Sequence, residues 1–78
     1  MDKKVLRING NSVVVVRTST GFKVMSGEVD DMFGSVTLIK GLDGEYSILD
    51  HKGTMTDEAT QVVQVIIENK ITDLSKLN

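Results

Sequence analysis

The chain has 78 residues, with seven glycines, no proline and no cysteine, and 40% of its residues are hydrophobic and 26% charged. This composition is that of one folded domain covering residues 1–78, and it excludes disorder, a disulfide scaffold and thiolate metal sites. The formal net charge of −2 and the scattered basic residues argue against a phosphate-backbone binder, and no apolar run approaches the roughly 18 residues of a membrane span.

The first residues begin like a secretory leader, but polar residues from Arg7 onward interrupt the apolar stretch that a leader needs. With neither a leader nor cysteine, we expect a cytoplasmic protein without membrane partners. A core this small supplies only a few kcal/mol of net stability, and association with a second copy is one common remedy.

Turn signals recur about every ten residues, the spacing of a small sheet or barrel. Asn9-Gly10 is a strong type I′ hairpin signal because both residues accept a positive φ. It places Leu6 opposite Val13 and Val5 opposite Val14. The predicted strands cover about residues 4–8, 12–18, 22–29, 35–40 and 45–50.

A second hairpin signal, Asp43-Gly44, places Ile39 opposite Ile48 if these two residues form the whole loop. Gly27, inside the third predicted strand, indicates a bulge or a sharp bend. The polar stretch 51–53 is predicted to end the sheet.

The second strand carries Val13-Val14-Val15-Val16, which is apolar on both faces, whereas a half-solvated strand would alternate. Such a strand either lies inside the sheet with both of its faces covered, or is buried in an oligomer. At a free edge it would be an aggregation hazard.

A helix is predicted over about residues 56–70, followed by a tail at 71–78. Thr54 and Thr56 can both cap it, and acidic residues in the first turn suit the helix dipole. A sixth strand is the rival interpretation, because many of the apolar residues are β-branched. The helical spacing is carried by Ala59, Val62, Val63, Ile66 and Ile67.

The apolar arc of this helix spans about 240°, well beyond the ~100° stripe of a one-sided surface helix. Three covers are open: the tail residues Leu74 and Leu77, the curled sheet, or a second subunit. The predicted fold class is therefore α+β: a five-stranded, curled antiparallel meander, a half-barrel of SH3-like or OB-like size, with one C-terminal helix on its concave face or across its open end.

Asp50-His51 is the one acid and histidine neighbour pair, and a general base needs an oriented imidazole. Neighbours on a strand point to opposite faces, so the pair would be oriented only across a turn. A turn that closes a hairpin is the simpler interpretation. No nucleotide loop, zinc spacing or nucleophile elbow is present, and we expect no enzyme activity, no catalytic residue and no cofactor.

Glu28, Asp30 and Asp31 form the densest acidic group, and closely spaced oxygen ligands can hold Ca²⁺ or Mg²⁺. The stretch lacks the EF-hand pattern, so we expect a solvated loop without a metal. The adjoining Met32-Phe33 would anchor a partner protein if exposed, or cap the end of the sheet if tucked under it. The predicted docking loop comprises Asp30, Asp31, Met32 and Phe33.

Two further surfaces are predicted. An oligomer surface would use Val14, Val16 and Val65. An anion-binding surface would form if four cations on predicted strands shared a face, with Phe22 and Tyr46 as the strand aromatics that could stack on a base; solvated outer-face charges are the simpler interpretation. The four cations are Arg7, Arg17, Lys23 and Lys40.

The sequence thus favours a small interaction module: a homo-oligomeric adaptor, regulator or inhibitor that binds itself, as a dimer or larger, and an unidentified protein. Its size is typical of phage or mobile-element accessory proteins. The alternative is a binding module for a small anionic ligand such as a nucleotide, or for nucleic acid, although the acidic net charge disfavours nucleic acid.

Overall fold

The computed structural model describes residues 2–27 and 33–77. Five strands form one antiparallel sheet in the order β1-β2-β3-β4-β5, curled but not closed, and a single α-helix follows. The predicted fold class is confirmed. The elements are β1 (Lys3–Ile8), β2 (Asn11–Arg17), β3 (Gly21–Ser26), β4 (Gly34–Lys40), β5 (Tyr46–Gly53), α1 (Asp57–Asn69) and the single 3₁₀ turn η2 (Leu74–Lys76).

The first hairpin has the predicted turn and register. Asn9 and Gly10 take φ values of 52° and 80°, so both loop residues are left-handed as a type I′ turn requires. Leu6 pairs with Val13 and Val5 pairs with Val14. Local turn chemistry alone was sufficient to predict this register.

The last hairpin differs from the prediction by one residue. Ile39 pairs with Ser47 rather than Ile48, because the loop is longer than Asp43-Gly44: the Gly41 N–H donates to the Glu45 carbonyl over 2.8 Å. The Asp43 carboxylate accepts the Glu45 N–H at 2.9 Å, an Asx turn that competes with the two-residue loop. A register shift between Thr37 and Leu38 then restores the predicted pairing further along the strands.

Two strand ends also differ from the prediction. β3 ends at Ser26, because Gly27 has a φ of 92° and leaves the strand rather than forming a bulge within it. β5 continues through residues 51–53, which were expected to end the sheet, since Lys52 pairs with Ser35 and Gly53 with Gly34.

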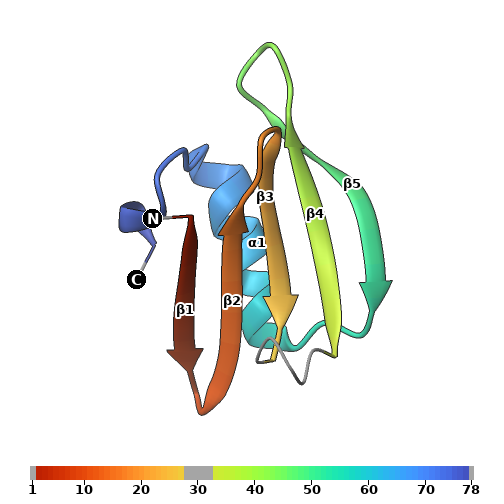
Figure 1. Ribbon diagram of the computed structural model, residues 1–78, viewed down its shortest axis with the longest axis vertical. Coiled ribbons are helices and arrows are strands. Elements are labelled where there is room, and N and C mark those ends of the chain that lie inside the picture. The colour runs from red at the N-terminus through yellow and green to blue at the C-terminus, as the bar shows by residue number, and fades with distance from the viewer. Residues whose placement is uncertain (1, 28–32, 78) are drawn as a thin grey trace.

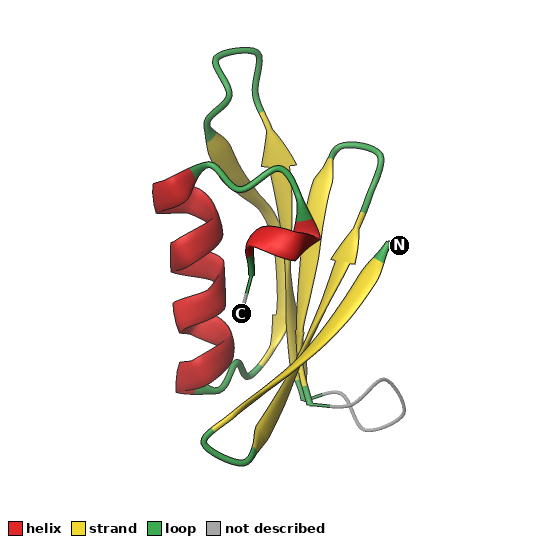
Figure 2. Ribbon diagram, turned by 90° about the vertical axis from the view of Figure 1, so that its left-hand side faces the viewer, coloured by secondary structure: helices red, strands yellow, loops and turns green. Residues whose placement is uncertain are grey.

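Helix α1 packs on one face of the sheet, behind β2 and β3 in Figure 1, and the opposite face carries no helix (Figure 2). Alternate strand residues point toward the helix, and the helix residues spaced three and four apart point toward the sheet, so both sets pack in one core. The valines of β2 lie in the middle of the sheet, as expected for a central strand. The buried core comprises Leu6, Val13, Val15, Phe22, Val24, Val36, Leu38, Tyr46, Ala59, Val62, Val63, Ile66, Leu74 and Leu77.

Helix α1 begins where the sheet anchors its cap. Thr56 is the N-cap, and its Oγ1 accepts the Ala59 N–H at 3.2 Å. The Thr56 N–H in turn donates to the Ser26 Oγ at 3.1 Å, which ties the helix start to the end of β3. The helix is therefore the correct interpretation of this segment, and Thr56 rather than Thr54 caps it.

The tail provides one of the three covers considered for the helix. Lys70 adopts a left-handed φ of 50° and ends α1. The chain then turns back, and the η2 turn lies on the same side of the sheet as α1 (Figure 2). The side chains of Leu74 and Leu77 are buried in the core. No helix in the described part of the chain is long and apolar enough to cross a membrane.

We predict that Gly10→Val lowers the free energy of unfolding by about 1–2 kcal/mol, the cost of holding an L-residue in the left-handed region. A Cβ at Gly10 would meet no atom within 4 Å, so backbone strain alone is tested. Urea denaturation measures the change. Gly10→Asn, which tolerates this conformation, is the control and should stay near the parent; equal midpoints for all three proteins would contradict the turn.

We predict that Val15→Asp abolishes cooperative unfolding, because it buries an unpaired charge at a fully buried core position. The control is Val5→Asp, on the opposite face and about half exposed, which should change stability little. Thermal melting followed by circular dichroism separates them. A normal transition for Val15→Asp would show that β2 is not central.

Candidate functional site

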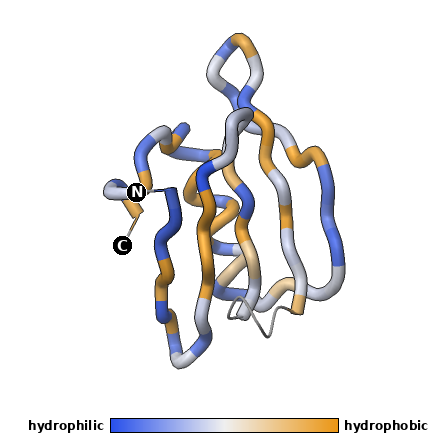
Figure 3. Tube along the Cα trace, viewed as in Figure 1, coloured by the Kyte–Doolittle hydropathy of each residue, from blue (hydrophilic) through white to orange (hydrophobic). Residues whose placement is uncertain are grey.

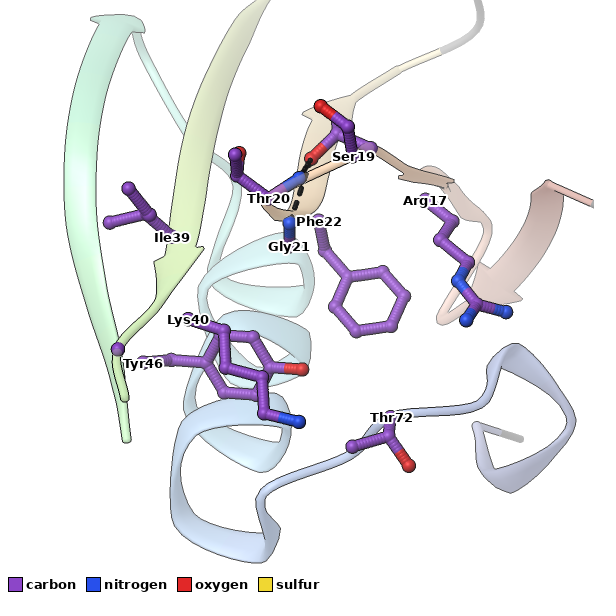
Figure 4. Close-up of a pocket in the computed structure, with 11 residues that line it drawn as sticks. Arg17, Ser19, Thr20, Gly21, Phe22, Ile39, Lys40, Tyr46 and Thr72 are labelled. Carbon is purple, nitrogen blue, oxygen red and sulfur yellow. Dashed lines mark hydrogen bonds between the residues drawn. The ribbon is translucent and has the colours of Figure 1, made fainter. Parts of the chain in front are cut away.

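A pocket of about 400 Å³ opens at the end of the sheet where β2, β4 and the linker between α1 and η2 converge (Figure 4). Its walls are the turn of residues 18–21, residues 39–41 at and just beyond the end of β4, the first residue of β5 and Thr72 of the linker. We refer to it as the linker pocket. Its volume falls within the ~300–1,000 Å³ of small-molecule sites.

The turn that forms one wall is rigidly built. The Thr18 hydroxyl accepts the Gly21 N–H at 2.9 Å, and the Thr20 carbonyl accepts the Lys40 N–H at 2.8 Å. A Cβ at Gly21 would lie 2.3 Å from the Leu38 carbonyl oxygen, so only glycine lets β3 and β4 approach this closely.

Two cations flank the linker pocket, Arg17 at the end of β2 and Lys40 at the end of β4. Arg17 pairs with Phe22 and Lys40 with Tyr46 across their strands, which places both cations on the helix-covered face. Figure 4 shows their side chains reaching toward the same space from two sides. Among the described residues, no carboxylate oxygen lies within ion-pair distance of either cation.

The carboxylates around the pocket are engaged elsewhere. Glu45 pairs with Lys70 at 3.0 Å, and this hydrogen bond raises the pKa of Lys70. Asp73 caps η2 by accepting the Ser75 N–H at 3.0 Å, which lowers the pKa of Asp73, with a further contribution from Arg17.

Two aromatic rings form the floor of the pocket. The Phe22 and Tyr46 ring centroids lie 6.0 Å apart at an interplanar angle of 47°. The Tyr46 hydroxyl donates to the Ile71 carbonyl at 2.5 Å, which holds the linker over the pocket. Burial raises the pKa of Tyr46, and Arg17 acts on it in the opposite direction.

The predicted set of four cations is split by the structure. Arg17 and Lys40 meet at the linker pocket, whereas Lys23 pairs with Val16 and Thr37 on the opposite face. Arg7 lies at the other end of the sheet, beside a second pocket of about 210 Å³, and donates to the Ser12 Oγ at 3.3 Å. No local sequence pattern pointed to Thr72, which joins the pocket through the fold of the tail.

Strand β5 forms one open edge of the sheet. Among the described strands it pairs with β4 alone, and every residue after Tyr46 is exposed. The adjacent Ile48 and Leu49 are 58% and 62% exposed, and β5 passes from hydrophobic to hydrophilic along its length (Figure 3). This surface, which we call the β5 edge, was not among the predicted sites.

The three residues of the predicted oligomer surface do not lie together. Val14 is 1% exposed and lies with the partly buried Val16 in β2. Val65, 41% exposed, lies on α1 beside an apolar groove against β1 and the tail. The chain itself covers most of the apolar helix arc and of β2.

The predicted docking loop falls mostly outside the described residues. Asp30, Asp31 and Met32 lie there, as does Glu28 of the acidic group. Phe33 is described and is 64% exposed, so this ring is not tucked under the sheet. Within residues 2–27 and 33–77, no group of three or more His, Cys, Asp or Glu side chains is arranged to hold a metal ion.

The Asp50-His51 pair lies inside β5, not in a turn. Asp50 pairs with Thr37 and His51 with Val36, so the two side chains stand on opposite faces of the sheet and the carboxylate does not orient the imidazole. Instead, an Asp50 carboxylate oxygen lies 3.9 Å from the Lys52 Nζ, two residues further along the same face.

No family model matches this sequence, and the comparisons with curated proteins and with solved structures found no match.

We predict that Tyr46→Phe lowers the free energy of unfolding by about 1 kcal/mol, the net worth of one hydrogen bond, and accelerates amide exchange at Leu74 and Leu77, because the linker loses its anchor at Ile71. Hydrogen exchange by NMR measures this. Thr60→Val, which removes the exposed hydroxyl bonded to the Thr56 carbonyl, is the control. Equal exchange at the tail in both variants would contradict the anchoring role.

Proposed function

We propose that this chain is a small non-enzymatic interaction module that works as a homodimer, joined through the β5 edge. The observation that carries the proposal is an eight-residue edge strand with exposed apolar side chains and an unpaired side. Such a strand is a template for pairing with a second strand. Antiparallel addition would continue the sheet through ten strands.

The two edges of the sheet are not equivalent. β1 carries Lys3, Lys4 and Arg7, and lysine on an edge strand discourages pairing. The Lys4 ammonium also donates to the carbonyls of Leu74 and Leu77, so the tail lies against this edge. β5 carries one lysine, Lys52, against the three basic residues of β1, and all its residues after Tyr46 are exposed. Pairing β5 with β5 leaves the guarded β1 edges at both ends and closes the assembly as a twofold dimer, whereas β1 on β5 would be open-ended.

Charge complementarity selects a register for the dimer. With the twofold axis at His51, Asp50 of each chain faces Lys52 of the other, and Leu49 faces Gly53, which leaves room for the leucine side chain. An axis at Asp50 would instead oppose two carboxylates. The Asp50 and Lys52 pair within one strand is exposed and worth little by itself, so both charges are free to pair across the interface.

The apolar surface of β2 is covered within one chain. Of the two interpretations of Val13 to Val16, a central strand or a strand buried in an oligomer, the first fits, because Val13, Val14 and Val15 are buried within a single chain. The apolar surface that supports association lies on β5 instead.

We further propose that the dimer acts on a larger protein as an adaptor, regulator or inhibitor in the cytoplasm. The exposed ring of Phe33 supports such a contact, because aromatic side chains are enriched in interface cores. The lack of cysteine in the sequence supports the reducing compartment.

We predict that Lys52→Glu raises the dimer dissociation constant about tenfold, because two attractive cross-strand pairs become repulsive. Asp50→Lys should do the same, and the double swap should restore association. Sedimentation equilibrium measures the mass against that of the 8.5 kDa chain.

The matched control is Lys3→Glu, an identical charge change on the β1 edge, which should leave the dissociation constant unchanged. A chain that stays monomeric at all concentrations, or a double swap that fails to rescue association, would overturn the β5 edge as the interface.

A further inference from the structure

We infer that the linker pocket is a binding site for a phosphomonoester, a dianionic phosphoryl group on a small organic body. The site is separate from the β5 edge and stands independently of the proposed dimer. It rests on the convergence of two cations, a polar rim and an aromatic floor in one concavity.

Charge is the first argument. Arg17 and Lys40 bring two positive charges to the pocket, and in the described chain neither has an ion-pair partner. A phosphomonoester carries about −1.5 to −2 charges near neutral pH, which matches this pair. The guanidinium can bind phosphate oxygens in a bidentate way, and the ammonium acts as a point charge.

The protein's own carboxylates could compete with a bound phosphate for Arg17 and Lys40. Glu45 is neutralised by Lys70, and the Asp73 carboxylate is held by the Ser75 N–H at the start of η2. With these contacts made, neither the Glu45 nor the Asp73 carboxylate forms an ion pair with Arg17 or Lys40. The pocket is thereby left as a positively charged recess in an acidic protein.

Shape is the third argument. At about 400 Å³ the pocket exceeds the needs of a phosphate ion alone, and the rings of Phe22 and Tyr46 supply an apolar floor for an organic body. Figure 4 shows the Tyr46 hydroxyl pointing toward the space between the two cations, and Thr72 lines the pocket from the linker. The Thr72 hydroxyl makes no hydrogen bond within the described chain, so it can donate to a ligand oxygen.

The location also argues against a nucleic-acid surface. Lys23 stands on the other face of the sheet and Arg7 at the other end. The four strand cations therefore form no continuous track for a phosphate backbone, which such binding requires. A small ligand that contacts two cations is the better fit.

The test is an NMR titration of the isotope-labelled full chain with adenosine 5′-monophosphate, adenosine and inorganic phosphate at low salt. We expect shifts at residues 17–21, Lys40 and Thr72 with the monophosphate, none with adenosine, and weaker binding as salt rises. If inorganic phosphate binds at the same residues but more weakly than the monophosphate, the organic body of the ester contributes to binding. Equal affinities for the two would overturn the role proposed for the organic body.

Arg17→Gln and Lys40→Gln should each raise the dissociation constant about tenfold, the loss expected for one charged hydrogen-bond partner. Lys23→Gln is the matched control and should bind as the parent does. All three positions are on the surface, and melting temperatures confirm that the variants fold.

Three results would overturn the site: no shift with either phosphate probe, equal effects of Lys23→Gln and the pocket variants, or tighter binding of a single-stranded oligonucleotide that depends on Lys23. The last result would favour a nucleic-acid surface over the linker pocket.

Discussion

The structure depends on the packing of α1 against the central strands, since one face of β2, β3 and β4 is apolar and must be removed from water. The Ser26 hydroxyl fixes where the helix starts by accepting the Thr56 N–H. The length of α1 then decides where the chain turns back, and the left-handed Lys70 sends the tail over the end of the sheet. The core, the covered β1 edge and the linker pocket all follow from the packing of α1 on the sheet.

Helix α1 contacts β2, β3 and β5, whereas the tail lies against β1, so the two edges of the sheet differ. The tail accompanies β1, where Lys4 bonds to its carbonyls, while β5 is left with its apolar side chains in solvent. A small domain that cannot cover both edges with its own chain gains most from a partner at the uncovered edge. The asymmetry of the fold is the physical basis for a twofold rather than an open-ended assembly.

The linker pocket arises where the helix and sheet do not meet. Tyr46 bridges them by packing its ring on Phe22 and binding the Ile71 carbonyl, which holds the linker at a fixed height above the strand ends. Arg17 and Lys40 end their strands at this level and extend into the space that remains. The proposed dimer and the proposed ligand site thus occupy different parts of β5, its exposed middle and its buried first residue.

The sequence by itself determined the α+β class, the first hairpin and the helix, because Asn9-Gly10, the Thr56 cap and the apolar period are local signals. It also named Arg17 and Lys40 among its cations. The register of the last hairpin needed the structure because two local turns compete at Asp43, and the Asx turn shifts the pairing by one residue. Tertiary structure alone decided which cations share a face and which apolar residues stay exposed, because those outcomes depend on contacts between residues far apart in the chain, such as Tyr46 with Ile71, that no local pattern encodes.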